Sequence, residues 1–61
     1  MINMEDLVIG REYRFRYWYN DRVMDCTATL KSINPALGRL NLRQTRRYAL
    51  DIERIMEAIP L

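Results

Sequence analysis

The stretch that decides the fold is residues 12–19, which read Glu-Tyr-Arg-Phe-Arg-Tyr-Trp-Tyr. Two sets of side chains alternate here: Tyr13, Phe15, Tyr17 and Tyr19 form one, and Glu12, Arg14, Arg16 and Trp18 form the other. A period of two with aromatic enrichment is typical of a half-buried β-strand, because successive side chains point to opposite faces. We therefore expect a strand with the tyrosines and Phe15 in the core. The reverse, with Trp18 in the core and some tyrosines outside, stays open.

A turn and a second strand are predicted next. Asn20-Asp21 suits a tight turn, although it lacks the glycine that such turns prefer. Residues 22–33 then alternate, with Met24, Cys26, Ala28 and Leu30 facing one way and Asp25, Thr27, Thr29 and Lys31 the other. The β-branched threonines suit an exposed pleat. The apolar pattern changes phase near Ser32-Ile33, which indicates a bulge or the end of the strand.

A third strand follows a second turn. Residues 34–38, Asn-Pro-Ala-Leu-Gly, have the composition of a turn, because proline fixes φ and glycine supplies a positive φ. We expect residues 39–43 to form a strand with Leu40 and Leu42 inward and Asn41 outward. The three strands together predict an antiparallel meander.

The C-terminal residues fit two structures. Tyr48, Ile52, Ile55 and Ile59 are spaced as on one face of an amphipathic helix, which would cover a three-stranded sheet. The alternative is a short strand over residues 47–50, a helical turn over 51–54 and a last strand over 55–59. Pro60 ends either version, because proline cannot donate a backbone hydrogen bond.

Length and composition limit what the chain can do. At 61 residues it is a single domain near the lower limit for folding alone, and pairing of two copies would enlarge its core, so a homodimer is open. Cys26 is the only cysteine and histidine is absent, which predicts no disulfide within the chain, no zinc site and no activated nucleophile. We expect no enzyme activity and no cofactor. The apolar runs are far shorter than the ~20 residues that span a bilayer, and we expect a cytoplasmic protein.

Charge is segregated along the chain. Residues 11–47 carry nine basic residues against three acids, a net charge of +6, whereas both flanking segments are acidic. Nine of the ten basic residues are arginine, whose planar guanidinium suits phosphate or carboxylate and stacks on rings. An arginine-biased genome would give the same composition.

Arg14, Arg16 and Trp18 form the first candidate site, on the predicted outer face of the first strand. Small barrels often hold single-stranded nucleic acid on such a face, where arginine pairs with phosphate and a ring stacks on a base. The other explanation is an ordinary outer face with a half-buried tryptophan that packs on a neighbour.

A second candidate site comprises Arg39, Arg43, Arg46 and Arg47. Phosphate contact is one explanation, and an acidic protein surface would satisfy the same residues. The alternative is a solvated edge that resists strand-to-strand aggregation.

Several stretches together resemble YolD-like proteins: Tyr17-Trp18-Tyr19-Asn20-Asp21, then Thr27-Ala28-Thr29-Leu30-Lys31-Ser32-Ile33-Asn34-Pro35, then Arg39-Leu40-Asn41-Leu42, and finally Ala49-Leu50-Asp51-Ile52-Glu53-Arg54-Ile55. The resemblance spans residues 13–59. Ala28 stands where the family usually has glycine, and Asp21-Arg22 replaces its Asp-Gly turn. Residues 46–55 are also similar to the end of WYL domains.

Both resemblances imply a small five-stranded antiparallel barrel of the Sm/SH3-like type, and they favour strand–turn–strand at the C-terminus. The first implies a bacterial, phage or plasmid protein that acts as an accessory or regulatory partner of Y-family DNA polymerases. Two other functions stay open: direct nucleic-acid binding through the arginine and tryptophan face, and a structural or assembly role in a phage.

Overall fold

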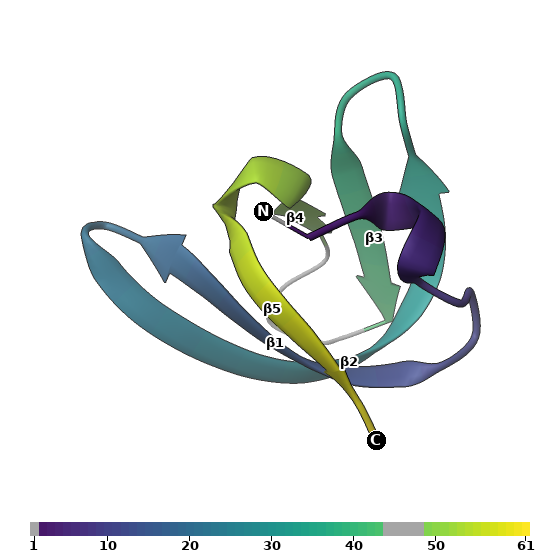
Figure 1. Ribbon diagram of the computed structural model, residues 1–61, viewed down its shortest axis with the longest axis horizontal. Helices are drawn as coiled ribbons and strands as arrows, with labels where there is room; N and C mark the ends of the chain where they lie inside the picture. The colour runs from purple at the N-terminus through teal and green to yellow at the C-terminus, as the bar shows by residue number, and fades with distance from the viewer. Residues whose placement is uncertain (1, 44–48) are drawn as a thin grey trace.

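The computed structural model describes residues 2–43 and 49–61 and places five antiparallel strands in one sheet. The strands are β1 (Glu12–Tyr19), β2 (Arg22–Asn34), β3 (Arg39–Arg43), β4 (Ala49–Asp51) and β5 (Ile55–Pro60). Two 3₁₀ turns, η1 (Met4–Asp6) and η2 (Ile52–Arg54), complete the elements. The sheet order is β4-β3-β2-β1-β5, and the sheet coils on itself as a small open barrel (Figure 1). This confirms the predicted mostly β fold.

β2 is the long strand around which the sheet bends. Its first part pairs with β1 and its last part pairs with β3, and Figure 1 shows it following the curve of the sheet. The register with β3 shifts between Leu30 and Ser32. A bulge adds a residue on one strand and increases the local twist, which helps β2 to turn the sheet. The predicted change of phase near Ser32 is therefore confirmed as a bulge.

The two predicted turns are both present, and each uses residues with positive φ. Asn20 and Asp21 have φ of 50° and 59°. This left-handed conformation lets a two-residue hairpin turn match the right-handed twist of the strands that it joins. Gly38, with φ of 63°, closes the β2–β3 turn, and its carbonyl accepts a 2.7 Å hydrogen bond from Ile52 N–H. A Cβ at Gly38 would lie 3.3 Å from Ile52 Cγ2, so both φ and space favour glycine here.

The core lies inside the coiled sheet and draws on every strand. Its buried members are Tyr13, Phe15, Tyr17, Ala28, Leu30, Leu40, Leu42, Leu50 and Ile55. The rings of Tyr13 and Phe15 lie 5.6 Å apart, and the Tyr13 hydroxyl accepts a 2.8 Å hydrogen bond from Val8 N–H. The predicted inward sets of the first three strands are confirmed for these residues, and the inverse assignment with Trp18 in the core is wrong.

Two residues predicted to face the core are instead exposed. Tyr19 is 42% exposed and Met24 is 39% exposed. They lie on the inner face, but the pairing of β1 with β5 ends at Tyr17↔Ile55. On the other side, β3 pairs with β2 only from Thr29 onward, so neither β5 nor β3 flanks this end of the β1–β2 hairpin and its inner face stays open to solvent.

The C-terminal residues adopt the strand–turn–strand structure, and the single amphipathic helix is wrong. β4 pairs with β3, and β5 pairs with β1. As strands, these residues therefore give β3 and β1 a second hydrogen-bonded neighbour in the sheet, which a helix would not do. Leu50 and Ile55 fill the core on either side of η2. The first residues of the predicted fourth strand, 47 and 48, lie outside the described part of the chain.

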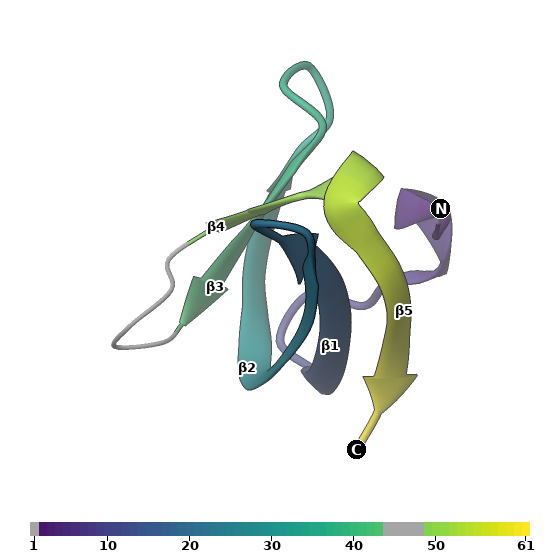
Figure 2. The same cartoon turned by 90° about the vertical axis from the view of Figure 1, so that its left-hand side faces the viewer.

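The N-terminal segment packs beside the barrel, near β5 (Figure 2). Asn3 caps the N-terminus of η1, and its side chain accepts a 3.0 Å hydrogen bond from Glu5 N–H. Ile2, Met4 and Leu7 pack against the core. Within residues 2–43 and 49–61, no helix is long and apolar enough to cross a membrane.

Candidate functional site

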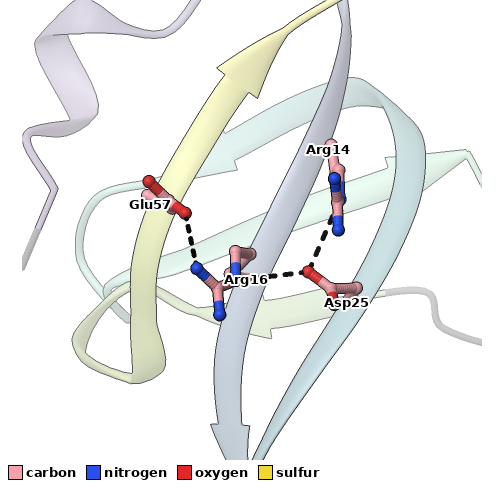
Figure 3. Close-up of polar contacts among 4 residues, drawn as sticks. All are labelled: Arg14, Arg16, Asp25 and Glu57. Carbon is pink, nitrogen blue, oxygen red and sulfur yellow. Dashed lines mark hydrogen bonds and ion pairs between the residues drawn. The ribbon is translucent and has the colours of Figure 1, made fainter.

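The first candidate group lies on the outer face of the sheet, where Arg14 and Arg16 meet carboxylates of both neighbouring strands (Figure 3). Arg16 is in register with Asp25 of β2 and with Glu57 of β5. Its Nη1 donates a 3.0 Å hydrogen bond to Glu57 Oε1, and its Nε lies 3.5 Å from Asp25 Oδ1. Arg14 Nε lies 3.6 Å from the same Asp25 oxygen.

The region around Arg14 and Arg16 is therefore balanced in charge, although the sequence alone makes it look basic. Its two guanidiniums lie against two carboxylates, each roughly half exposed. Exposed pairs of this kind stabilise a fold by only ~0–1 kcal/mol. Their larger effect is on ligands, because a phosphate bound here would have to compete with Asp25 and Glu57 for the same donors.

Trp18 shares the outer face with Arg14 and Arg16 but lies at a different place on it. It is opposite Val23 in the hairpin register, beyond the last β5 pair. Trp18 is 48% exposed and Val23 is 39% exposed. The sequence thus groups three residues that the structure divides into an ion-paired region and an apolar one.

The end of the β1–β2 hairpin, residues 18–24, carries apolar side chains on both faces, and we call it the hairpin end. Trp18 and Val23 lie on the outer face, and Tyr19 and Met24 lie on the inner face. Figure 1 shows this hairpin extending away from the rest of the sheet. Clustered exposed apolar residues mark interaction sites more often than scattered ones do. The hairpin end is therefore the best-defined candidate surface.

A hollow of about 340 Å³ lies at the base of the hairpin end. One wall consists of β1 and turn residues, namely Tyr17, Trp18, Tyr19 and Asn20; the other consists of Arg39, Ala49, Leu50, Asp51 and Arg54 from β3, β4 and η2. Asp51 Oδ1 accepts a 3.2 Å hydrogen bond from Arg39 Nε, and its Oδ2 lies 3.8 Å from Arg54 Nε. One carboxylate thus faces two guanidiniums at the edge of an aromatic wall.

The second arginine group is only partly within the described chain. Arg39 and Arg43 lie on the same side of β3 and are both exposed. Arg39 pairs with Asp51, whereas Arg43 forms no ion pair within residues 2–43 and 49–61. Arg46 and Arg47 lie outside the described residues, so the group remains a prediction.

The other features carry less chemistry. A second hollow, of about 520 Å³, separates the N-terminal segment from Tyr13, Ala58 and Pro60. Cys26 is partly buried and packs against the core. In the described part of the chain, no three acidic or cysteine side chains gather in a way that could hold a metal ion.

Sequence reasoning missed the exposure of Tyr19 and Met24 and the pairing of Arg39 and Arg54 across Asp51. The predicted strand lengths held a partial signal for the exposure of Tyr19. The first strand, residues 12–19, is longer than the predicted last strand, residues 55–59, so pairing of the two leaves part of the first strand without a neighbour.

No protein family, curated protein or solved structure that we compared with the chain matches it.

Proposed function

We propose that this protein is a non-catalytic accessory module that docks onto another protein through the hairpin end. The observation that carries the proposal is the exposure of Trp18, Tyr19, Val23 and Met24 together on one projecting hairpin. Tryptophan and tyrosine are the side chains that contribute most often to the centres of protein interfaces. A hairpin with apolar residues on both faces can enter a groove of a partner and bury both faces.

The ion pairs of the outer face favour protein docking over direct nucleic-acid binding. Arg14 and Arg16 share the outer face of β1 with Trp18, and both already lie against Asp25 or Glu57. Nucleic-acid affinity depends on guanidinium and ammonium groups that neutralise phosphates. A region in which two arginines lie against two carboxylates supplies little of that attraction.

The partner that we propose is a DNA-transaction protein, with a Y-family DNA polymerase as the leading example. This part of the proposal is supported by the resemblance of residues 13–59 to YolD-like proteins. The small barrel and its exposed hairpin are compatible with such a role, and the same surface would also suit an assembly contact in a phage.

The test is a binding titration of the full chain with a Y-family polymerase encoded in the same genome. We expect saturable binding that is lost in Val23→Lys, because lysine would place a charge in the apolar contact. Thr27→Lys is the matched control: it adds the same charge to the same outer face of β2, opposite Arg14 and away from the hairpin end. Binding that is weakened equally by both variants, or no binding at all, contradicts the proposal.

Single-stranded DNA is the second ligand in that test. If the protein binds DNA directly, affinity falls steeply with salt and falls further in Arg14→Ala with Arg16→Ala. We expect instead weak binding to single-stranded DNA that this double substitution leaves unchanged. A strong, salt-sensitive affinity that depends on these two arginines would favour the nucleic-acid alternative.

A further inference from the structure

The hollow at the base of the hairpin end combines an apolar wall with two arginines that share one carboxylate. Its volume of about 340 Å³ lies near the lower end of the sizes typical of ligand pockets. Trp18 and Tyr19 form part of one wall, and Leu50 lies on the opposite side. A space of this size and lining can accept one aromatic or large aliphatic side chain.

The cationic groups have donors to spare. Each guanidinium carries five N–H groups, and toward the side chains of residues 2–43 and 49–61 Arg39 uses only its Nε–H, which donates to Asp51. Arg54 has only the 3.8 Å approach to Asp51 and forms no hydrogen bond with any side chain that the structure describes. Two positive charges against one negative charge leave a local excess of +1. The edge of the hollow is thus suited to an anion.

The surroundings of the hollow favour a protein segment over a nucleic-acid strand. A phosphate backbone needs a row of cations, but on the outer face Arg14 and Arg16 lie against carboxylates, and Arg43, at the other end of β3 from Arg39, lies outside the hollow lining. The surface that continues from the hollow is the apolar hairpin end, with Val23 and Met24 exposed. An acidic segment with an apolar residue matches both the charge of the hollow and its apolar continuation.

We propose that the hollow binds a short acidic segment of a protein partner, with an aromatic side chain inside it and carboxylates on Arg39 and Arg54. This inference rests on the proposed docking function and names the part of the partner that the site selects. Charge-assisted hydrogen bonds from arginine to carboxylate give the orientation, and the buried ring gives the anchor.

The direct test uses the full chain and a capped pentapeptide with phenylalanine between two pairs of aspartates. Trp18 is the only tryptophan, so its fluorescence reports on the hollow. We expect a saturable change for this peptide, and none for a peptide with lysines in place of the aspartates. Equal responses to both peptides, or no response up to about 1 mM, overturn the inference. A response to inorganic phosphate or to oligothymidylate that exceeds the peptide response also overturns it.

Variants of the hollow separate charge recognition from a general effect of net charge. Arg39→Gln with Arg54→Gln should weaken peptide binding about tenfold or more, because two charge-assisted contacts are lost. Arg11→Gln with Arg43→Gln is the matched control, since it removes the same charge from exposed arginines outside both the hollow lining and the hairpin end. Equal losses in both double variants overturn the inference.

Asp51→Asn gives a test of opposite sign that does not depend on the arginine variants folding. Asp51 precedes η2 but makes no side-chain cap hydrogen bond there, so the turn does not need its charge. Asparagine removes the negative charge that repels the aspartates of the peptide, so peptide binding should tighten by about threefold. Weaker binding in Asp51→Asn overturns the inference.

The same variants distinguish this inference from the proposed function. Loss of polymerase binding in Val23→Lys, with normal binding in Arg39→Gln with Arg54→Gln, overturns the role of the hollow and leaves hairpin docking in place. Normal polymerase binding in both contradicts hairpin docking as well. Loss in both, with the Arg11→Gln and Arg43→Gln control unaffected, supports the two together.

Discussion

The two ends of β1 are built from the same kinds of residue, yet they differ in what surrounds them. From Tyr13 to Tyr17 the strand has β2 on one side and β5 on the other. At Trp18 and Tyr19 only β2 remains. Where both neighbours are present, the aromatic residues are buried and the arginines find carboxylates across two strands. Where one is missing, aromatic residues are exposed on both faces.

The comparison shows that a strand's pattern gives the direction of each side chain but not what covers it. Tyr17 and Tyr19 point to the same face, yet Tyr17 is buried and Tyr19 is exposed. The difference comes from β5, whose pairing with β1 ends at Tyr17. The exposed end of β1 is therefore a consequence of sheet geometry, and it is the part available to a partner.

The largest expected effect contrasts Phe15 with Trp18. Phe15 is fully buried at the centre of the double-sided part of β1. Phe15→Ala should destabilise the fold by about 3–5 kcal/mol, which leaves so small a domain largely unfolded. Trp18→Ala should cost less than about 1 kcal/mol, since the residue is 48% exposed in the folded protein. Urea denaturation followed by circular dichroism measures the free energy of unfolding of both variants. Similar losses of stability in the two would contradict the division of β1 into a covered part and an exposed end.

An intermediate effect is expected at Gly38, whose carbonyl accepts a hydrogen bond from the first residue of η2. This contact supports the wall of the hollow that β3, β4 and η2 form. Gly38→Ala should destabilise by about 1–2 kcal/mol, because alanine is strained at a φ of 63° and its Cβ would approach Ile52 closely. Gly10→Ala is the control, since it also has a positive φ but no atom within 4 Å of the added Cβ. Because alanine is more strained at the φ of 92° at Gly10 than at 63°, a Gly38→Ala cost well below that of Gly10→Ala would show that the contact with Ile52 contributes little.

The smallest expected effect is at the ion pairs of the outer face. Glu57→Gln should change stability by less than about 1 kcal/mol, and the difference should shrink at high salt. It should, however, strengthen binding of single-stranded DNA, because Arg16 would lose one of its two carboxylates. Fluorescence anisotropy at low salt measures the second effect. No gain in DNA affinity would mean that Glu57 does not limit access to Arg16.

Much of this fold follows from local pattern. Strict alternation over residues 12–19 and the turn residues Asn20-Asp21 and Pro35 to Gly38 set three strands, because side-chain period and turn chemistry act over a few residues. The C-terminus was ambiguous, since isoleucines at 52, 55 and 59 fit a helix as well as a strand. Strand pairing decides it, and pairing is a property of distant segments.

The candidate site was less predictable for the same reason. The pattern placed Arg14 and Arg16 on one face with Trp18, and it predicted the direction of each correctly. It could not show that Glu57, more than 40 residues later, would lie beside Arg16. Nor could it bring Arg39 and Arg54 to one carboxylate, because that requires the β4–η2 corner to fold back toward β3.

The most direct test of the account is a map of amide chemical-shift changes in the labelled full chain during titration with a Y-family polymerase of the same genome. The account predicts shifts or broadening at residues 18–24, including the Trp18 indole, and at the hollow residues Arg39, Asp51 and Arg54. The amides of Arg14, Arg16 and Thr27 should remain unchanged. Changes centred on Arg14 and Arg16, with the hairpin end unaffected, would contradict it.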